Sequence, residues 1–160
     1  MKVGRTTPRL HLAGTSACMA FALRRTARAI SRHYDDQLRA CGLRVSQLTI
    51  LIALAKSGPV SMTELAATIH VDATTLSRNL RPMARSGWLE ICARGAGRHR
   101  SVALKPVGRR VLARALPRWR RTQRRMLAAY GAVDWNRLRA DLDRLLYAPE
   151  RRHSGTRNRP

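Results

Sequence analysis

The residues best suited to binding chemistry lie between positions 72 and 83. Thr74, Ser77, Arg78 and Arg81 would share one face of a helix, and the Asp72 carboxylate can cap that helix by accepting hydrogen bonds from its free backbone N–H groups. The opposite face would be apolar, with Leu76, Leu80 and Met83. Small polar side chains permit close approach, and arginine binds guanine or phosphate through two parallel hydrogen bonds. The pattern predicts a helix that enters the major groove of duplex DNA.

A second short helix and a basic hairpin are expected beside this one. Ser61 followed by Glu64 is a capping box, which predicts a helix over residues 62–70. Gly87 breaks the helical pattern, and residues 88–92 and 101–104 then alternate as two strands of a hairpin. Its tip is basic, with Arg94, Arg98, His99 and Arg100. We expect Arg94, Arg98 and Arg100 to contact phosphates or the minor groove.

Long amphipathic helices are expected on both sides of this head. Residues 16–40 contain neither Gly nor Pro, and apolar residues recur every three or four positions before Gly42. The next helix should follow Ser46 and turn four residues inward: Leu48, Leu51, Ile52 and Ala55. Residues 106–130 predict a long helix that Pro117 would kink, and Asp134 would cap the last one. The head needs no such stripes for its own core, so the terminal helices predict a homodimer.

Composition favours a nucleic acid as the partner. The 160 residues contain 32 Lys+Arg and 9 Asp+Glu, which leaves a net charge of +23 spread along the chain. Aromatic residues, on which single-stranded bases stack, make up 4% of the chain, so duplex DNA is favoured. No stretch approaches ~20 consecutive apolar residues, so no membrane partner is expected. The sequence has no P-loop, paired carboxylates or metal-ligand cluster, which predicts neither an enzyme nor a cofactor nor a metal site.

Three cysteines bear on the cellular compartment. Cys18, Cys41 and Cys92 match no zinc spacing and leave an odd thiol if two of them pair. A reducing, cytoplasmic location fits this usage. The apolar stretch at residues 10–23 is interrupted by polar residues and continued by arginines, so we do not interpret it as a signal peptide.

Four motifs in a fixed order resemble the MarR family of bacterial winged-helix regulators. They are GLRVSQLTIL at 42–51, TELA at 63–66, DATTLSRNL at 72–80 and GWL at 87–89, within a resemblance that spans residues 18–146. The resemblance implies a homodimeric repressor that a small molecule or an oxidant releases from a pseudo-palindromic operator. Two positions depart from the family pattern: Ala96 stands where a wing aspartate commonly pairs with Arg98, and Lys105 replaces a threonine while Gly108 is retained.

The resemblance also places two effector hypotheses on the first long helix. His33 and Tyr34 fall where the family often builds a ligand crevice, although ordinary packing explains them equally well. One branch senses hydroperoxides through a cysteine near the start of this helix, which makes Cys18 a redox candidate. By register, however, Ala20 occupies that branch's sensor position. A nonspecific architectural DNA-binding protein is a further alternative, because +23 exceeds what a sequence reader requires.

The predicted architecture is mainly α, a winged helix-turn-helix head between dimerisation helices. Residues 1–14 would form a flexible basic arm and residues 148–160 a disordered basic tail. Residues 15–147 would form one MarR-like domain. Within it, residues 43–105 would be the head with its small β-hairpin wing, and residues 15–41 and 106–147 would dimerise.

Overall fold

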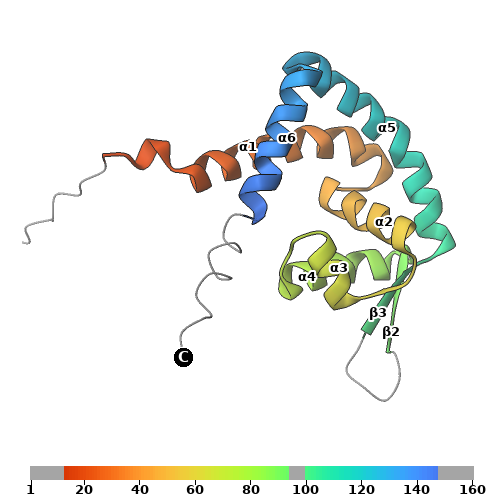
Figure 1. Ribbon diagram of the computed structural model, residues 1–160. Coiled ribbons are helices and arrows are strands. Elements are labelled where there is room, and N and C mark those ends of the chain that lie inside the picture. The colour runs from red at the N-terminus through yellow and green to blue at the C-terminus, as the bar shows by residue number, and fades with distance from the viewer. Residues whose placement is uncertain (1–12, 94–99, 148–160) are drawn as a thin grey trace, which may run out of the picture.

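A computed structural model describes residues 13–93 and 100–147 of the chain (Figure 1). The α-helices are α1 Met19–Leu38, α2 Val45–Ser57, α3 Met62–Thr68, α4 Ala73–Arg85, α5 Pro106–Tyr130 and α6 Ala132–Tyr147. The strands are β1 Val60–Ser61, β2 Leu89–Ala93 and β3 Arg100–Leu104, and the 3-10 turns η1 Thr15–Ala17 and η2 Arg39–Cys41 flank α1. This mainly helical winged fold confirms the predicted fold class. The expected basic arm and tail lie largely outside the described residues.

Side-chain caps fix the starts of the short helices. Ser61 Oγ accepts a hydrogen bond from the Glu64 N–H (3.1 Å) and Glu64 Oε2 accepts one from the Ser61 N–H (2.9 Å), which confirms the capping box of α3. Asp35 of α1 accepts a hydrogen bond from the Val45 N–H (2.6 Å), so α2 begins one residue before Ser46. These side-chain hydrogen bonds therefore fix the residues at which α2 and α3 begin.

The expected cap of α6 was wrong. The helix begins at Ala132, so Asp134 lies inside its first turn instead of preceding it. Gly131, with φ at 100°, ends α5 and accepts a backbone hydrogen bond from Trp135. Two helices thus meet at a single glycine, because glycine tolerates the positive φ that the sharp reversal requires. α5 continues through Pro117 as one helix.

The sheet has one strand more than the predicted hairpin. Its order is β1-β3-β2, with both pairs antiparallel and with Val102 opposite Val60 on one side and Ile91 on the other. Val102 is fully buried. A strand of two residues is too short to show an alternation pattern, which is why the sequence did not reveal β1.

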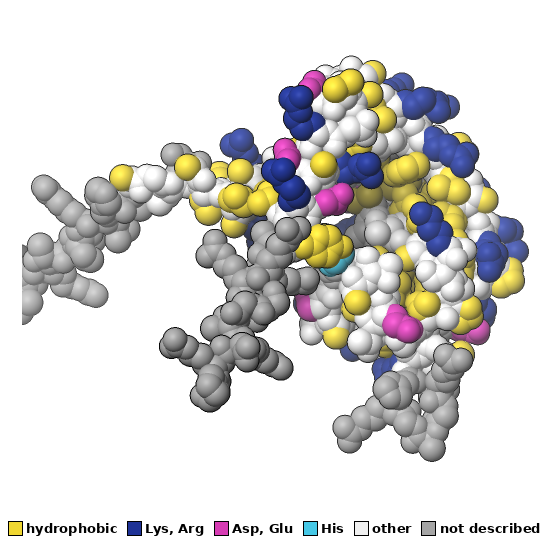
Figure 2. Space-filling model, viewed as in Figure 1, with side chains coloured by type: hydrophobic (Ala, Val, Ile, Leu, Met, Phe, Trp, Pro, Cys, Tyr) yellow, Lys and Arg dark blue, Asp and Glu magenta, His cyan; other side chains and the backbone are white. Residues whose placement is uncertain are grey.

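The apolar residues of α1 and α6 lie largely on the surface of the single chain. Figure 2 shows hydrophobic side chains exposed along α1, where Met19 is 58% and Phe21 is 56% exposed. Within the described residues, α6 buries no side chain completely. Likewise, no single described helix is long and apolar enough to cross a membrane; α1 with η2 and α2 meet that criterion by length and composition only as a pair bent by 73°.

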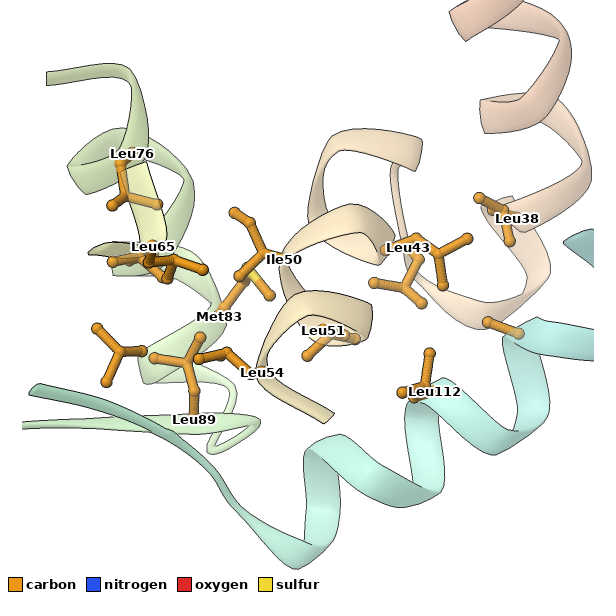
Figure 3. Close-up of a cluster of buried hydrophobic side chains, with 14 residues drawn as sticks. Leu38, Leu43, Ile50, Leu51, Leu54, Leu65, Leu76, Met83, Leu89 and Leu112 are labelled. Carbon is orange, nitrogen blue, oxygen red and sulfur yellow. The ribbon is translucent and has the colours of Figure 1, made fainter. Parts of the chain in front are cut away.

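The core forms around α2, which lies between the two halves of the domain (Figure 3). On one side are α3, α4 and the sheet, and on the other are α1 and α5. Because both sides are covered, α2 buries Leu48, Ile50, Leu51 and Leu54. The expectation that Ala55 faces inward was wrong, since its side chain is exposed. A single amphipathic stripe does not describe a helix that is packed on two sides.

A close backbone approach joins α5 to the sheet. A Cβ atom added to Gly108 would lie 2.1 Å from the Trp88 carbonyl oxygen and 2.7 Å from Leu104 Cδ1. The Lys105 N–H donates a hydrogen bond to the same Trp88 oxygen (3.0 Å). A larger residue at position 108 would push the start of α5 away from the sheet, so glycine there holds α5 against the head.

Candidate nucleic-acid interface

Helix α4 begins with the predicted cap. Asp72 Oδ1 accepts a hydrogen bond from the Thr75 N–H (2.8 Å), and Oδ2 accepts one from the Thr75 hydroxyl (2.7 Å). The Thr75 side-chain hydrogen bond, reinforced by the backbone hydrogen bond, lowers the pKa of the Asp72 carboxyl from its usual value. Asp72 therefore holds the first turn of α4 in place as an ionised cap.

The two faces of α4 differ as predicted. Leu76, Leu80 and Met83 are buried in the core. On the other side, Thr74, Arg78 and Arg81 are exposed and Ser77 is half-buried. These four line one shallow hollow on the surface together with three further residues, Ala73, Pro82 and Arg85. The predicted site residues of α4 are thus brought together on one accessible face.

Arg85 is a member of this face that the sequence reasoning missed. It is exposed and lies four residues after Arg81 and seven after Arg78, so it continues the same helical face. That spacing was visible in the sequence. The structure shows that α4 is helical through Arg85, so this side chain stays on the same face as Arg78 and Arg81.

Asn79 joins α4 to α2. The Asn79 side-chain Nδ2 donates a hydrogen bond to the Thr75 carbonyl oxygen (2.9 Å), and the Ser46 hydroxyl donates one to Asn79 Oδ1 (3.3 Å). Both polar atoms of this amide are therefore engaged within the protein. Asn79 braces the orientation of α4 on α2, and the exposed side chains beside it remain available to a partner.

The short connection between α3 and α4 has an unusual backbone. His70 has φ at 51°, a left-handed conformation that side chains other than glycine rarely adopt. The His70 ring packs edge-on against the Tyr147 ring of α6, with centroids 6.1 Å apart. The end of α6 thus contacts the turn that sets the angle between α3 and α4.

The wing is described only in part. Arg100 is exposed at the start of β3, where it pairs in register with Ala93 of β2. Arg94, Arg98 and the Ala96 position of the wing lie outside the described residues. The contacts of Arg94, Arg98 and Arg100 with phosphates or the minor groove stay predictions.

His33 and Tyr34 point in different directions from α1. Tyr34 is 8% exposed, and its hydroxyl donates a hydrogen bond to Gln123 Oε1 of α5 (2.5 Å). Burial raises the pKa of the Tyr34 phenol. His33 is exposed to solvent. The structure therefore uses Tyr34 to tie α1 to α5, and it places His33 away from that contact.

The cysteines are separate from one another in the fold. Cys18 is exposed at the N-cap position of α1, where its side chain makes no capping hydrogen bond. Cys41 is half-buried with its thiol 3.7 Å from the Arg114 carbonyl oxygen, and Cys92 is exposed on β2. All three are free thiols. In the part of the chain that the structure describes, no cluster of three His, Cys, Asp or Glu side chains is arranged to hold a metal ion.

Comparison with known proteins identifies the family. A model of the MarR family matches residues 42–100. The transcriptional regulator MosR of M. tuberculosis, solved in complex with DNA, is 38% identical; the match covers 83% of this chain and 96% of that one, with a TM-score of 0.76. A probable transcriptional regulator from Pseudomonas aeruginosa is 26% identical over 82% of this chain and 98% of that one, with a TM-score of 0.72.

A curated relative agrees with these matches. The uncharacterized HTH-type transcriptional regulator YwoH of Bacillus subtilis (strain 168) is 29% identical over 68 residues, which are 42% of this chain and 50% of YwoH. The chain therefore spans about half the length of this relative. The family match lies on the residues that form α2, α3, α4 and β2 and ends at the first residue of β3. The matches with the two solved relatives cover 83% and 82% of this chain. The chain belongs to the MarR family of winged-helix transcriptional regulators.

Proposed function

We propose that this chain is a homodimeric, sequence-specific regulator that reads a pseudo-palindromic operator in duplex DNA. The observation that carries the proposal is the exposed face of α4, where Thr74, Arg78 and Arg81 line an open hollow while the opposite face is buried. A capped helix with small polar residues and arginines on its outer side fits the major groove. MosR, which is 38% identical to this chain, was solved in complex with DNA, and this supports DNA as the partner here.

The homodimer is supported by large apolar side chains that one chain leaves exposed. Those on α1, α5 and α6 are Met19, Phe21, Leu23, Ile30, Val107, Tyr130, Val133, Leu145, Leu146 and Tyr147. Monomeric soluble proteins rarely expose contiguous apolar surface on this scale, and a second copy would cover it by symmetry. Sedimentation of the purified chain at micromolar concentration should give a dimer. A folded monomer would refute this part of the proposal.

The operator is tested by the DNA that the protein selects. Sheared genomic fragments retained by the purified protein should share one motif with two-fold symmetry. Because a symmetric dimer places two copies of α4 in successive major grooves, the half-sites should be centred about 10 bp apart. A footprint over one half-site, or an asymmetric motif, would contradict the proposal.

We extend the proposal to repression that a small molecule relieves. Support comes from the family and from the Tyr34–Gln123 hydrogen bond, which links α1 to α5 at a point where a ligand could change the angle between them. The protein should lower transcription from a promoter that contains its operator. A metabolite that raises the melting temperature of the protein should also release it from DNA, and it should do so less well for Tyr34→Phe.

We further propose how the chain is divided between these tasks. Residues 43–105 would bind the operator, and residues 15–41 and 106–147 would dimerise through their exposed apolar side chains. A regulator of this kind acts where the chromosome is, so we place it in the cytoplasm. A version that lacks residues 148–160 should keep its preference for the operator, because the proposed reading residues lie on α4.

A further inference from the structure

Helix α5 carries a concentration of positive charge that reading an operator with α4 does not use. Its 25 residues contain no acidic residue. They contain eight arginines, all exposed: Arg109, Arg110, Arg114, Arg118, Arg120, Arg121, Arg124 and Arg125. Figure 2 shows Lys and Arg side chains along the outer edge of the molecule, where Figure 1 places α5.

The arginines occupy one half of the helix. At ~100° per residue, all eight fall within about 180° of the circumference. The buried residues of α5, Gly108, Leu112, Ala115 and Thr122, fall in the other half. We call the arginine half the α5 basic face. It is continuous over ~24 Å between Arg109 and Arg125 at ~1.5 Å per residue.

This face is not neutralised by the protein's own acids. In the described ranges 13–93 and 100–147, the ion pairs are Arg39–Asp36 and Arg144–Asp141, and neither involves α5. The acids Asp35, Glu64 and Asp72 serve as helix caps in the head. Since α5 contains no acid of its own, none lies on the α5 basic face.

The arrangement destabilises the free helix. Arg121 has like charges at three neighbouring positions on its own face, Arg118, Arg124 and Arg125. Arginines at i and i+3 or i+4 repel one another and lower helix stability. A solvated surface would mix the two signs of charge, as α6 does with its Asp and Arg residues. A bound polyanion would turn the repulsion into attraction.

The α5 basic face points away from the reading helix. In Figures 1 and 3, α2 lies between α4 and α5, and α5 packs its buried half toward α2. The arginine half therefore faces outward on the side opposite α2. No residue of α5 lines the hollow on α4.

We propose that the α5 basic face binds the phosphate backbone of a second segment of duplex DNA while α4 holds the operator. The statement that α4 holds the operator at the same time rests on the proposed function. A face of ~24 Å spans about 7 bp of duplex, in which each strand carries one phosphate per ~3.4 Å. A membrane surface fits less well, because interfacial helices need a free apolar face and that of α5 is buried in the core.

The test compares two triple variants that remove equal charge. One is Arg114→Gln/Arg121→Gln/Arg124→Gln on the α5 basic face. The matched control, Arg151→Gln/Arg152→Gln/Arg157→Gln, removes three arginines from residues 148–160, a stretch that the proposed function assigns neither to the head nor to the dimer. Each full-length protein is first saturated with a short unlabelled operator duplex. A labelled duplex of about 30 bp with a scrambled sequence is then titrated in at several salt concentrations.

Wild type should bind the scrambled duplex while it holds the operator. The α5 triple variant should bind it about tenfold more weakly at ~0.1 M salt, and its slope of log K against log salt should be shallower by about 2–3 because each lost phosphate contact contributes ~0.9. The control should stay within about threefold of wild type. Affinity for the short operator should be unchanged in all three proteins.

Three results would overturn the proposal. Equal losses in both triple variants would mean that only net charge matters. A loss of affinity for the short operator in the α5 variant would make α5 part of the operator interface. The third is that α5 binds anionic phosphatidylserine vesicles and does not bind the scrambled duplex, in which case its partner is a membrane and not DNA. Failure of the proposed function is seen separately, as absent operator preference in wild type before any scrambled duplex is added.

The source of the second segment is resolved by a further arm. The operator is extended by flanking DNA on both sides, and no separate duplex is added. If α5 holds flanking DNA, the extension should strengthen wild-type binding and should not strengthen binding by the α5 triple variant. If α5 holds a separate molecule, the extension should have no effect, while the scrambled duplex still binds. Either result supports DNA binding by the α5 basic face. If neither result is observed, the proposal is overturned.

Discussion

The head and the helices that flank it contain similar apolar residues in very different surroundings. In the head, Leu51, Leu80 and Val102 have no exposed surface. On α1 and α6, Met19 is 58% and Val133 is 77% exposed. The head therefore completes its core within one chain, whereas the flanking helices present apolar surface that only another molecule would cover. Folding of the head and assembly through the ends should respond to different substitutions.

A second contrast separates α4 from α5. Both carry exposed arginines, but α4 combines Arg78 and Arg81 with small polar residues around a hollow and begins at an acidic cap. The α5 basic face has arginines and no acid. Base edges are distinguished by specific hydrogen bonds and apolar contacts, whereas contacts with phosphates carry no sequence information directly. We therefore expect α4 to decide which DNA is bound and α5 to affect how much.

The largest effect should come from the head core. Leu80→Ala removes a fully buried side chain of α4 and should lower the free energy of unfolding by about 2–5 kcal/mol. The loss should be the same at every protein concentration, because this core lies within one chain. Denaturant unfolding at two protein concentrations measures it. A loss that grows on dilution would place α4 in the assembly instead.

The next largest effect should come from α1. Leu23→Asp/Ile30→Asp places two charges on side chains that are 40% and 37% exposed in the single chain. The charges should weaken dimerisation by about 100-fold or more, roughly 3 kcal/mol, because a charge buried in an interface lacks a partner. Sedimentation should show monomers with unchanged far-UV circular dichroism. Persistence of the dimer would remove α1 from the interface.

A smaller effect of opposite sign is expected on α5. Arg121→Glu turns the repulsion between position 121 and its three arginine neighbours into attraction. The free energy of unfolding of the free protein should rise by about 1 kcal/mol at low salt. Arg139→Glu on α6 is the control, because it faces Asp143 four residues on and should destabilise slightly. Melting temperatures at low and high salt measure both. If the difference in melting temperature between wild type and Arg121→Glu does not shrink at high salt, charge repulsion on α5 is not the cause of that difference.

The smallest effect concerns the cap of α4. The pKa of Asp72 is lowered in the folded state by its hydrogen bonds to Thr75, so its contribution to stability is present above the unfolded-state pKa, ~3.9, and is lost as the pH falls through the lower folded value. Asp72→Asn keeps a capping oxygen but does not titrate. Wild type should therefore lose its advantage over Asp72→Asn progressively as the pH falls from 5 to below the unfolded-state pKa. A constant difference across that range would mean that the cap charge contributes nothing.

Local features were predictable from the sequence because neighbouring residues determine them. The capping box at Ser61, the Asp72 cap and the buried stripe of α4 each depend on residues within one or two turns, and the structure contains all of them. The MarR motifs made the order of the helices and strands in the head predictable as well. Their spacing identified the winged head before any contact between elements was known.

The rest depended on contacts between distant residues. β1 exists because Val60 pairs with Val102, and Ala55 is exposed because α2 is covered on two other sides. The left-handed backbone of His70 is only weakly indicated by its residue type, because histidine adopts a positive φ more often than most residues but still rarely. Separation of His33 from the buried Tyr34 follows from how α5 packs on α1. Only Arg85 could have been found earlier, from its spacing after Arg78 and Arg81.

The central claim is that α4 reads the operator, and one ratio tests it most directly. The affinity of each protein for its best operator is divided by its affinity for a scrambled duplex, at the same salt concentration. Arg78→Ala should lower this ratio about 5- to 150-fold, equivalent to about 1–3 kcal/mol, because a lost contact to a base edge removes discrimination. Arg139→Ala removes an exposed arginine of α6 and should leave the ratio unchanged. If Arg78→Ala keeps the full ratio and removal of residues 148–160 abolishes binding, α4 is not the reader.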